Sequence, residues 1–127
     1  MSKLIAIIDD EVEMEFLYSM LFETAIENKT VDFRFFSDSR VFIDWFQSNK
    51  PDLLLCDINL PHISGVELSK RIKESGHPVQ TYFVSGHDER DYKEVMKNLG
   101  VSRFISKPLD FNHVQTLIET DLGLSLS

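Results

Sequence analysis

Short apolar runs alternate with amphipathic segments along the whole chain, and this alternation limits the fold more than any other feature. The apolar runs predict strands, and the segments that follow them predict helices. Strands that alternate with helices pair in parallel, and the helices cover both faces of the sheet. We therefore expect an α/β fold with strands at 3–8, 31–36, 53–57, 79–84 and 103–106, and helices at 12–27, 39–48, 64–74, 88–98 and 110–120.

A single domain accounts for the whole length. The 127 residues can bury one core, which we expect to span about residues 3–122, followed by a tail at 123–127 that frays. No apolar run approaches the ~20 residues that cross a bilayer, and acids occur too early for a signal peptide. The one cysteine, Cys56, cannot form an internal disulfide, which fits a reducing compartment. These features predict a cytoplasmic protein.

The charge balance excludes some classes of partner. With 21 acidic and 13 basic residues, the net charge is −8. Such a chain is poorly suited to bind nucleic acid or an anionic membrane through general electrostatics, whereas divalent cations are favoured.

Polar residues follow four of the five expected strands. Asp9 and Asp10 follow the first strand, Asp57 ends the third, Ser85 follows the fourth and Lys107 follows the fifth. Because ligands of open parallel sheets bind outside the carboxyl ends of the strands, these residues mark the place to look for a site.

The chemistry of this set favours a phosphoryl group. Three carboxylates in one cleft repel one another, and a bound Mg²⁺ together with Lys107 would balance their charge. Asp57 is a carboxylate nucleophile that can form an aspartyl-phosphate, and Ser85 offers a hydroxyl to a phosphoryl oxygen. Each residue alone has an ordinary explanation, such as a helix cap for Asp9, Asp10 and Glu11 or a turn for Asp57. Their common position at strand ends favours the phosphate site.

Four motifs enclose these residues: IIDDE at 7–11, PDLLLCDINLPHISGVEL at 51–68, VSG at 84–86 and GVSRFISKP at 100–108. Together they resemble the receiver domain of two-component response regulators, and the similarity covers essentially the whole chain. The resemblance implies a flavodoxin-like, doubly wound sheet of five parallel strands in the order 2-1-3-4-5 with five helices.

The resemblance also implies roles for single residues. Asp57 is the expected phospho-acceptor, and Lys107 is expected to pair with the phosphoryl group. Asp10, Asp57 and the backbone carbonyl of Asn59 are the expected direct ligands of Mg²⁺, while Asp9 acts through water. Mn²⁺ is an alternative ion.

A switch is implied as well. In the family, a hydroxyl residue at the position of Ser85 and an aromatic residue at that of Phe104 change together on phosphorylation. The peptide bond between Lys107 and Pro108 is expected to be cis, a form essentially confined to proline. One departure is Gly86, where the family more often has alanine.

The partners follow from the same resemblance. A histidine kinase or a histidine phosphotransfer protein is the expected donor. The surface of the fourth helix, fifth strand and fifth helix would pass the signal to an unidentified downstream protein, and phosphorylation-dependent dimerisation is a further expectation. No output segment follows the last expected helix, so we expect action through another protein. The chain would catalyse only its own phosphorylation and dephosphorylation and is not expected to be a turnover enzyme.

The first expected helix has two apolar surfaces. Phe16 and Met20 lie on the side away from the sheet, among glutamates, and are candidate contacts for a partner, although lone exposed apolar residues are common. The side expected to pack on the sheet carries Met14, Leu17, Tyr18, Leu21, Phe22 and Ala25.

Three alternatives remain open. Asp57-Ile58-Asn59 superficially resembles the opening motif of an aspartate-nucleophile, Mg²⁺-dependent phosphatase of the haloacid dehalogenase type, although Asn59 stands where those enzymes place an acid. An FMN-binding flavodoxin would require a phosphate-binding loop after the first strand, where Asp9, Asp10 and Glu11 would repel FMN instead. The chain could also be a receiver cut from a larger regulator.

Overall fold

The computed structural model describes residues 2–127, which form one five-stranded parallel sheet in the order β2-β1-β3-β4-β5. Five α-helices and one short 3₁₀ turn, η1, connect and follow the strands. This confirms the expected doubly wound, flavodoxin-like α/β fold. The elements are β1 (Lys3–Ile8), α1 (Met14–Glu27), β2 (Val31–Phe36), α2 (Ser39–Phe46), β3 (Leu53–Asp57), α3 (Gly65–Glu74), β4 (Gln80–Ser85), η1 (Glu89–Tyr92), α4 (Lys93–Leu99), β5 (Arg103–Ser106) and α5 (Phe111–Leu122).

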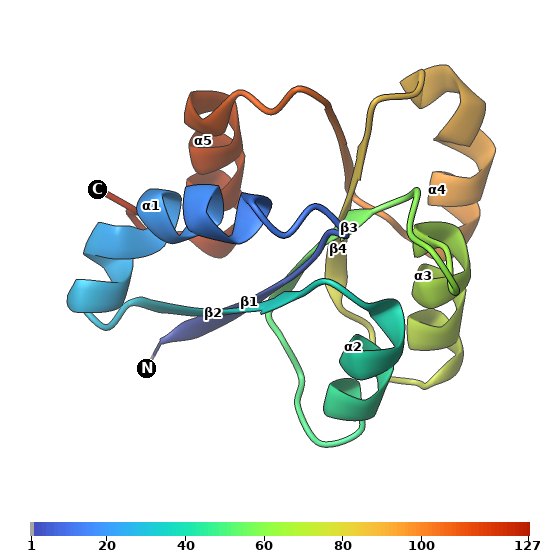
Figure 1. Cartoon of the computed structure of the whole chain (residues 1–127), viewed down its shortest axis with the longest axis horizontal. Helices are drawn as coiled ribbons and strands as arrows, with labels where there is room; N and C mark the ends of the chain where they lie inside the picture. The colour runs from blue at the N-terminus through green and yellow to red at the C-terminus, as the bar shows by residue number, and fades with distance from the viewer. Residues whose placement is uncertain (1) are drawn as a thin grey trace.

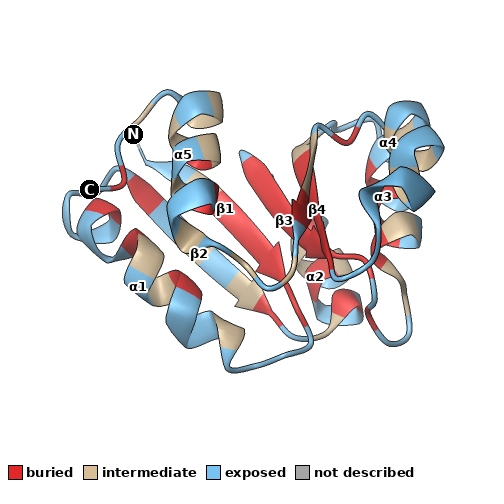
Figure 2. Cartoon of the chain, turned by 90° about the horizontal axis from the view of Figure 1, so that it is seen from above, coloured by how far each residue is buried: buried red, intermediate tan, exposed pale blue. Residues whose placement is uncertain are grey.

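The helices form two layers around the sheet. Helices α1 and α5 lie on one side, and α2, α3 and α4 lie on the other (Figure 1). Alternate residues of β3 therefore enter different cores: Leu53 and Leu55 pack with α1 and α5, while Leu54 and Cys56 pack with α2 and α3. The central strands are buried on both faces (Figure 2), as their continuous apolar runs predict.

The register of the sheet brings the strand ends to one edge. Ile8 of β1 pairs with Cys56 of β3, and Asp57 pairs with Val84 of β4. Ser85 pairs in turn with Ser106 of β5. The residues that follow these positions therefore emerge side by side, although they are far apart in the sequence.

Several element boundaries differ from expectation. The first helix begins at Met14 rather than at residue 12, and β4 extends to Ser85, which the sequence analysis placed after the strand. The helix expected at 88–98 is divided into η1 and α4, and Tyr92 is both the last residue of η1 and the N-cap of α4. Asp38 caps α2: its side chain accepts a hydrogen bond from the Arg40 N–H.

The tail does not fray, contrary to expectation. Gly123 adopts a left-handed conformation that ends α5, and the chain then folds back. Leu126 is buried in the core beside α1 and α5, and its backbone N–H donates to Glu119 Oε2 at 2.8 Å. The apolar side chain of the penultimate residue thus holds the tail against the core.

Helix α1 packs on the sheet through a narrower stripe than expected. Tyr18, Phe22 and Ala25 are buried, whereas Leu17 is exposed because it lies at the margin of the stripe, beside Phe111 of α5.

None of the helices in residues 2–127 is long and apolar enough to span a bilayer.

Candidate functional site

The acidic cluster lies where β1 and β3 end. Asp9 and Asp57 are buried, while Asp10 is exposed. One carboxylate oxygen of each residue lies within 4.8 Å of the others. The fold therefore brings together the three carboxylates that the sequence analysis selected.

Lys107 reaches this cluster from the loop after β5. Its Nζ lies 2.8 Å from Asp57 Oδ2, 3.3 Å from Glu11 Oε1 and 3.6 Å from Asp9 Oδ2. Its backbone N–H donates to the carbonyl of Ser85 at 2.8 Å, which ties this loop to the end of β4. The contact with Glu11 was not predicted, because the sequence suggested only a helix cap for that residue.

Tight turns hold the two buried carboxylates. The N–H of Asn59 donates to Asp57 Oδ1 at 2.9 Å, and the N–H of Glu11 donates to Asp9 Oδ1 at 2.9 Å. In both residues one oxygen is thus held by the backbone, and the other, Oδ2, is the one that faces Lys107. The role of the Asn59 carbonyl as a metal ligand stays a prediction.

Gly65 is a structural part of the site that was expected only as one residue of the motif at 51–68. It begins α3, and its N–H donates to the carbonyl of Ile58 at 2.9 Å. A Cβ at this position would lie 2.4 Å from the Asp57 carbonyl oxygen and 2.8 Å from the Ile58 Cα. Only glycine allows α3 to approach the end of β3 so closely.

The electrostatics of the cluster are unbalanced. Burial raises the pKa of Asp9 to about 6, although the Glu11 N–H and Lys107 both lower it. Burial alone would lower the pKa of Lys107, but the hydrogen bond to Asp57 and the charge of Asp9 outweigh burial and raise the pKa. The cluster thus holds four carboxylates, counting Glu11, and one ammonium group, which contacts three of them. A divalent cation fits this excess of charge, and carboxylate oxygens are the donors that Mg²⁺ prefers.

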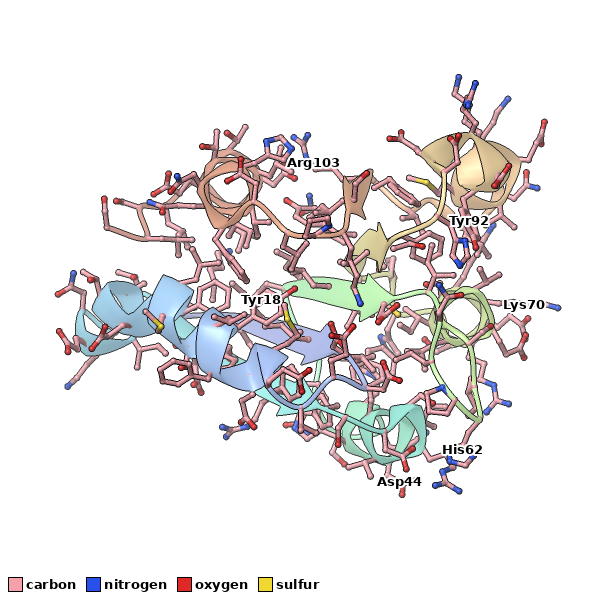
Figure 3. The ribbon with its side chains drawn as sticks, turned by 45° about the horizontal axis from the view of Figure 1, so that its top comes forward. Tyr18, Asp44, His62, Lys70, Tyr92 and Arg103 are labelled. Atoms are coloured by element: carbon pink, nitrogen blue, oxygen red, sulfur yellow. The ribbon has the colours of Figure 1, made fainter. Side chains whose placement is uncertain are left out.

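The expected switch residues lie beside the cluster on β4 and β5. Ser85 is buried, and its Oγ accepts a hydrogen bond from the His87 N–H at 3.0 Å. Phe104 is half-buried and stacks on Tyr92, with ring centroids 6.0 Å apart. Figure 3 shows Tyr92 at the start of α4. The peptide bond between Lys107 and Pro108 is cis.

A comparison with protein families agrees with this geometry. The model of the response regulator receiver domain matches residues 5–119, which is most of the chain. The chain belongs to the receiver domain family of response regulators. Receivers are signalling modules that bind Mg²⁺ in an acidic pocket, and the cluster of Asp9, Asp10 and Asp57 corresponds to such a pocket.

The receiver is similar to several characterised regulators. The transcriptional regulatory protein FixJ of Bradyrhizobium diazoefficiens is 26% identical over 116 residues, or 91% of this chain and 55% of FixJ. Sporulation initiation phosphotransferase F of Bacillus subtilis is 27% identical over 82 residues, or 65% of this chain and 66% of that protein. The chain thus spans about half the length of FixJ, two thirds of the phosphotransferase and 23% of the transcriptional regulator NtrC of Proteus hauseri.

Solved structures share the fold of the receiver. The signal receiver domain of a LuxO repressor protein from Vibrio parahaemolyticus superposes with a TM-score of 0.85 at 20% identity, over 97% of this chain and 92% of that one. Full-length FixJ from B. japonicum gives a TM-score of 0.80 at 27% identity, over 95% of this chain and 58% of that one.

The raised pKa of Asp9 predicts how the stability of the metal-free protein depends on pH. Because the pKa is about 6 in the folded state and 3.8 as a free side chain, ionising Asp9 between these values costs folding free energy. Asp9→Asn removes that cost. We expect the variant to be more stable than the wild type by about 1–3 kcal/mol at pH 7.5, and the difference to shrink below pH 4.

Urea unfolding with a chelator present, repeated across pH 3.5–8, measures this difference. Asp44→Asn, at an exposed position on α2 (Figure 3), is the matched control and should show no such dependence. A pH-independent difference, or an Asp9→Asn variant that is less stable at pH 7.5, would contradict the prediction.

Proposed function

We propose that this receiver accepts a phosphoryl group on Asp57 from a histidine kinase or a histidine phosphotransfer protein. The observation that carries the proposal is the position of Lys107 Nζ, 2.8 Å from Asp57 Oδ2 beside the cluster of Asp9, Asp10 and Asp57. A cation held at the nucleophile neutralises charge where a phosphoryl group would arrive, and phosphoryl transfer depends mainly on such positioning and neutralisation.

The chemical step uses few groups of the chain. A carboxylate oxygen of Asp57 attacks phosphorus, the P–N bond to the donor histidine breaks, and its electron pair stays on the imidazole nitrogen. The ammonium group of Lys107 stabilises the phosphoryl oxygens, while the Asn59 N–H holds Asp57 in place. Mg²⁺ or Mn²⁺, held by Asp10, Asp57 and the Asn59 carbonyl and by Asp9 through water, would supply further charge neutralisation.

The cellular role that we propose for the receiver depends on this phosphoryl transfer to Asp57. Hydrolysis of the acyl-phosphate resets the receiver, which therefore catalyses only its own modification and has no turnover substrate. We place residues 1–127 in the cytoplasm as one receiver domain that acts through another protein, without direct contact to nucleic acid or membrane. The transcriptional activities named for longer relatives are not transferred to this chain.

Phosphorylation would act through a switch. The phosphoryl group draws the Ser85 hydroxyl away from the His87 N–H, and Phe104 leaves its stack on Tyr92 to fill the vacated space. The surface of α4, β5 and α5 then differs between the two states, and a downstream partner or a second receiver reads the difference. The phosphoryl group needs only to favour one of two existing arrangements.

Intact mass after incubation with acetyl phosphate and with phosphoramidate tests the proposed function. We expect a gain of one phosphoryl group that requires Mg²⁺ and is lost in Asp57→Asn. The exposed-site control, Asp44→Asn, should be modified like the wild type. A gain that persists in Asp57→Asn, or no gain from either donor in the folded wild type, would refute the assignment.

Ser85→Ala tests the switch separately. Beryllofluoride imitates the phosphoryl group on aspartate, and backbone amide NMR shifts report the response. In the variant, shifts around Asp57 should remain, while those of Phe104 and α4 fall to less than half of the wild-type value. Ser85→Thr keeps the hydroxyl and should restore them. Equal shifts of α4 in Ser85→Ala and wild type would remove Ser85 from the mechanism.

The outer face of α1 is the proposed contact for the phosphodonor. Phe16 and Met20 are 68% and 58% exposed, far more than large apolar residues in a packed helix. The stretch from Asp9 to Asn28 contains seven acidic residues and no basic residue, which favours a donor with basic side chains around an apolar centre.

The double variant Phe16→Ala/Met20→Ala should accept the phosphoryl group from the histidine donor about tenfold more slowly than the wild type, or slower still. A tenfold change in rate corresponds to losing the burial of one apolar side chain at the interface. Phosphorylation by acetyl phosphate requires no docking and should be unchanged. Val41→Ala, at a 56% exposed position on α2, is the control. An unaltered transfer rate in the double variant would exclude this surface.

A further inference from the structure

A cleft between α3 and α4 takes no part in the proposed phosphoryl chemistry. It lies where the two helices end, beside the beginning of β4, and thus at the edge of the sheet opposite Asp57. The two helices lie side by side in Figure 1. The cleft has a volume of about 440 Å³, within the range of small-ligand sites. Its apolar wall is formed by Ile72, Pro78, Val79, Leu99 and Val101.

The charge of this cleft is opposite to that of the protein. Lys73 and Lys97 are its only charged lining residues, whereas the chain as a whole has a net charge of −8. Neither lysine forms an ion pair with an acid of residues 2–127, and Lys73 Nζ donates instead to the backbone carbonyl of Asn98. Two lysines from neighbouring helices therefore line this apolar cleft without an acidic partner.

Ser69 supplies an independent observation. It lines the cleft from α3, and only 5% of its surface is exposed. Within the described part of the chain, its Oγ is the one buried side-chain polar atom without a hydrogen-bond partner. A buried hydroxyl without a partner costs free energy, which a ligand oxygen would recover.

We infer that this cleft binds a small organic anion with an apolar body, such as a medium-chain carboxylate. The carboxylate is held between Lys73 and Lys97, and the apolar chain lies against the wall formed by Ile72, Val79 and Leu99. The Ser69 hydroxyl donates to a ligand oxygen after a small side-chain adjustment. A neutral molecule of the same shape would leave both lysines unpaired and bind more weakly.

The position of the cleft gives the ligand a regulatory effect, which rests on the proposed function. Leu99 and Val101 belong to the same apolar cluster as Phe104 and Tyr92. A ligand seated against Leu99 therefore stabilises the present arrangement of α4 and opposes its change on phosphorylation. By linkage, phosphorylation of Asp57 weakens ligand binding by the same factor.

Binding is measured on the unphosphorylated protein by amide NMR titration in 0.15 M salt. Octanoate is the probe, octanamide is its neutral match, and acetate lacks the apolar body. Octanoate should give saturable shifts at Leu99, Gly100 and Val101 and bind at least fivefold more tightly than octanamide, and acetate should give none. Shifts located elsewhere, or equal affinity for octanoate and octanamide, would overturn the inference.

Variants separate the contributions. Lys73→Gln/Lys97→Gln should reduce octanoate affinity to that of octanamide, while Lys70→Gln, on α3 outside the cleft (Figure 3), should change it less than twofold. Ser69→Ala should weaken binding about twofold yet raise the thermal midpoint of the free protein, because it removes the unpaired hydroxyl. Unchanged affinity in the double lysine variant would also overturn the inference.

The regulatory effect is read from the fraction of receiver phosphorylated by acetyl phosphate. Saturating octanoate should lower this fraction in the wild type and leave it unaltered in Lys73→Gln/Lys97→Gln. An unaltered fraction in wild type with octanoate bound would overturn the coupling. If Asp57 accepts no phosphoryl group, the proposed function fails, while the binding result stands on its own.

Discussion

The ion pair between Lys107 and Asp57 is the interaction on which the site depends. It joins the ends of β3 and β5, and the same ammonium group also faces Asp9 and Glu11. Without this cation, two buried carboxylates would lie close together with no positive charge beside them, a costly arrangement in a protein interior. Even with it, burial keeps the pKa of Asp9 raised, so that its ionised form remains costly in the folded protein. The fold thus maintains an electrostatic strain that an arriving cation can relieve.

Most of the fold could be predicted from the sequence because its signals are local. The run from Leu53 to Cys56 is apolar at every position, so it had to be buried on both faces, and the alternation of strands and helices then required parallel pairing. The predictions that were wrong depend on contacts distant in sequence. The tail was expected to fray, but a left-handed Gly123 returns Leu126 to the core. The segment at 88–98 was expected to be one helix, but its first turn is a 3₁₀ turn whose Tyr92 stacks on Phe104 of β5.

Most of the site could also be predicted from the sequence, because its residues follow from the positions of the strand ends. Asp9, Asp57 and Lys107 directly follow or end strands, and parallel strands end at one edge, so their meeting follows from topology alone. Glu11 was missed because its partner, Lys107, lies 96 residues away and its local sequence suggests a cap. Gly65 was missed because its importance is steric. Any side chain at this position would place a Cβ only 2.4 Å from the Asp57 carbonyl oxygen, and no sequence pattern reveals such a close approach.

The two helices beside β5 differ in how firmly they are held. Arg103 forms two hydrogen bonds with Asp121 of α5, at 2.7 and 2.9 Å, and the hydroxyl of the buried Tyr82 donates to the same carboxylate. Helix α4 has no such anchor, buries no residue completely and begins in a 3₁₀ turn. Moving α5 would break a charged network beside the core, whereas moving α4 would mainly repack half-buried side chains around Phe104. A signal that starts at Asp57 therefore meets less resistance through α4 than through α5.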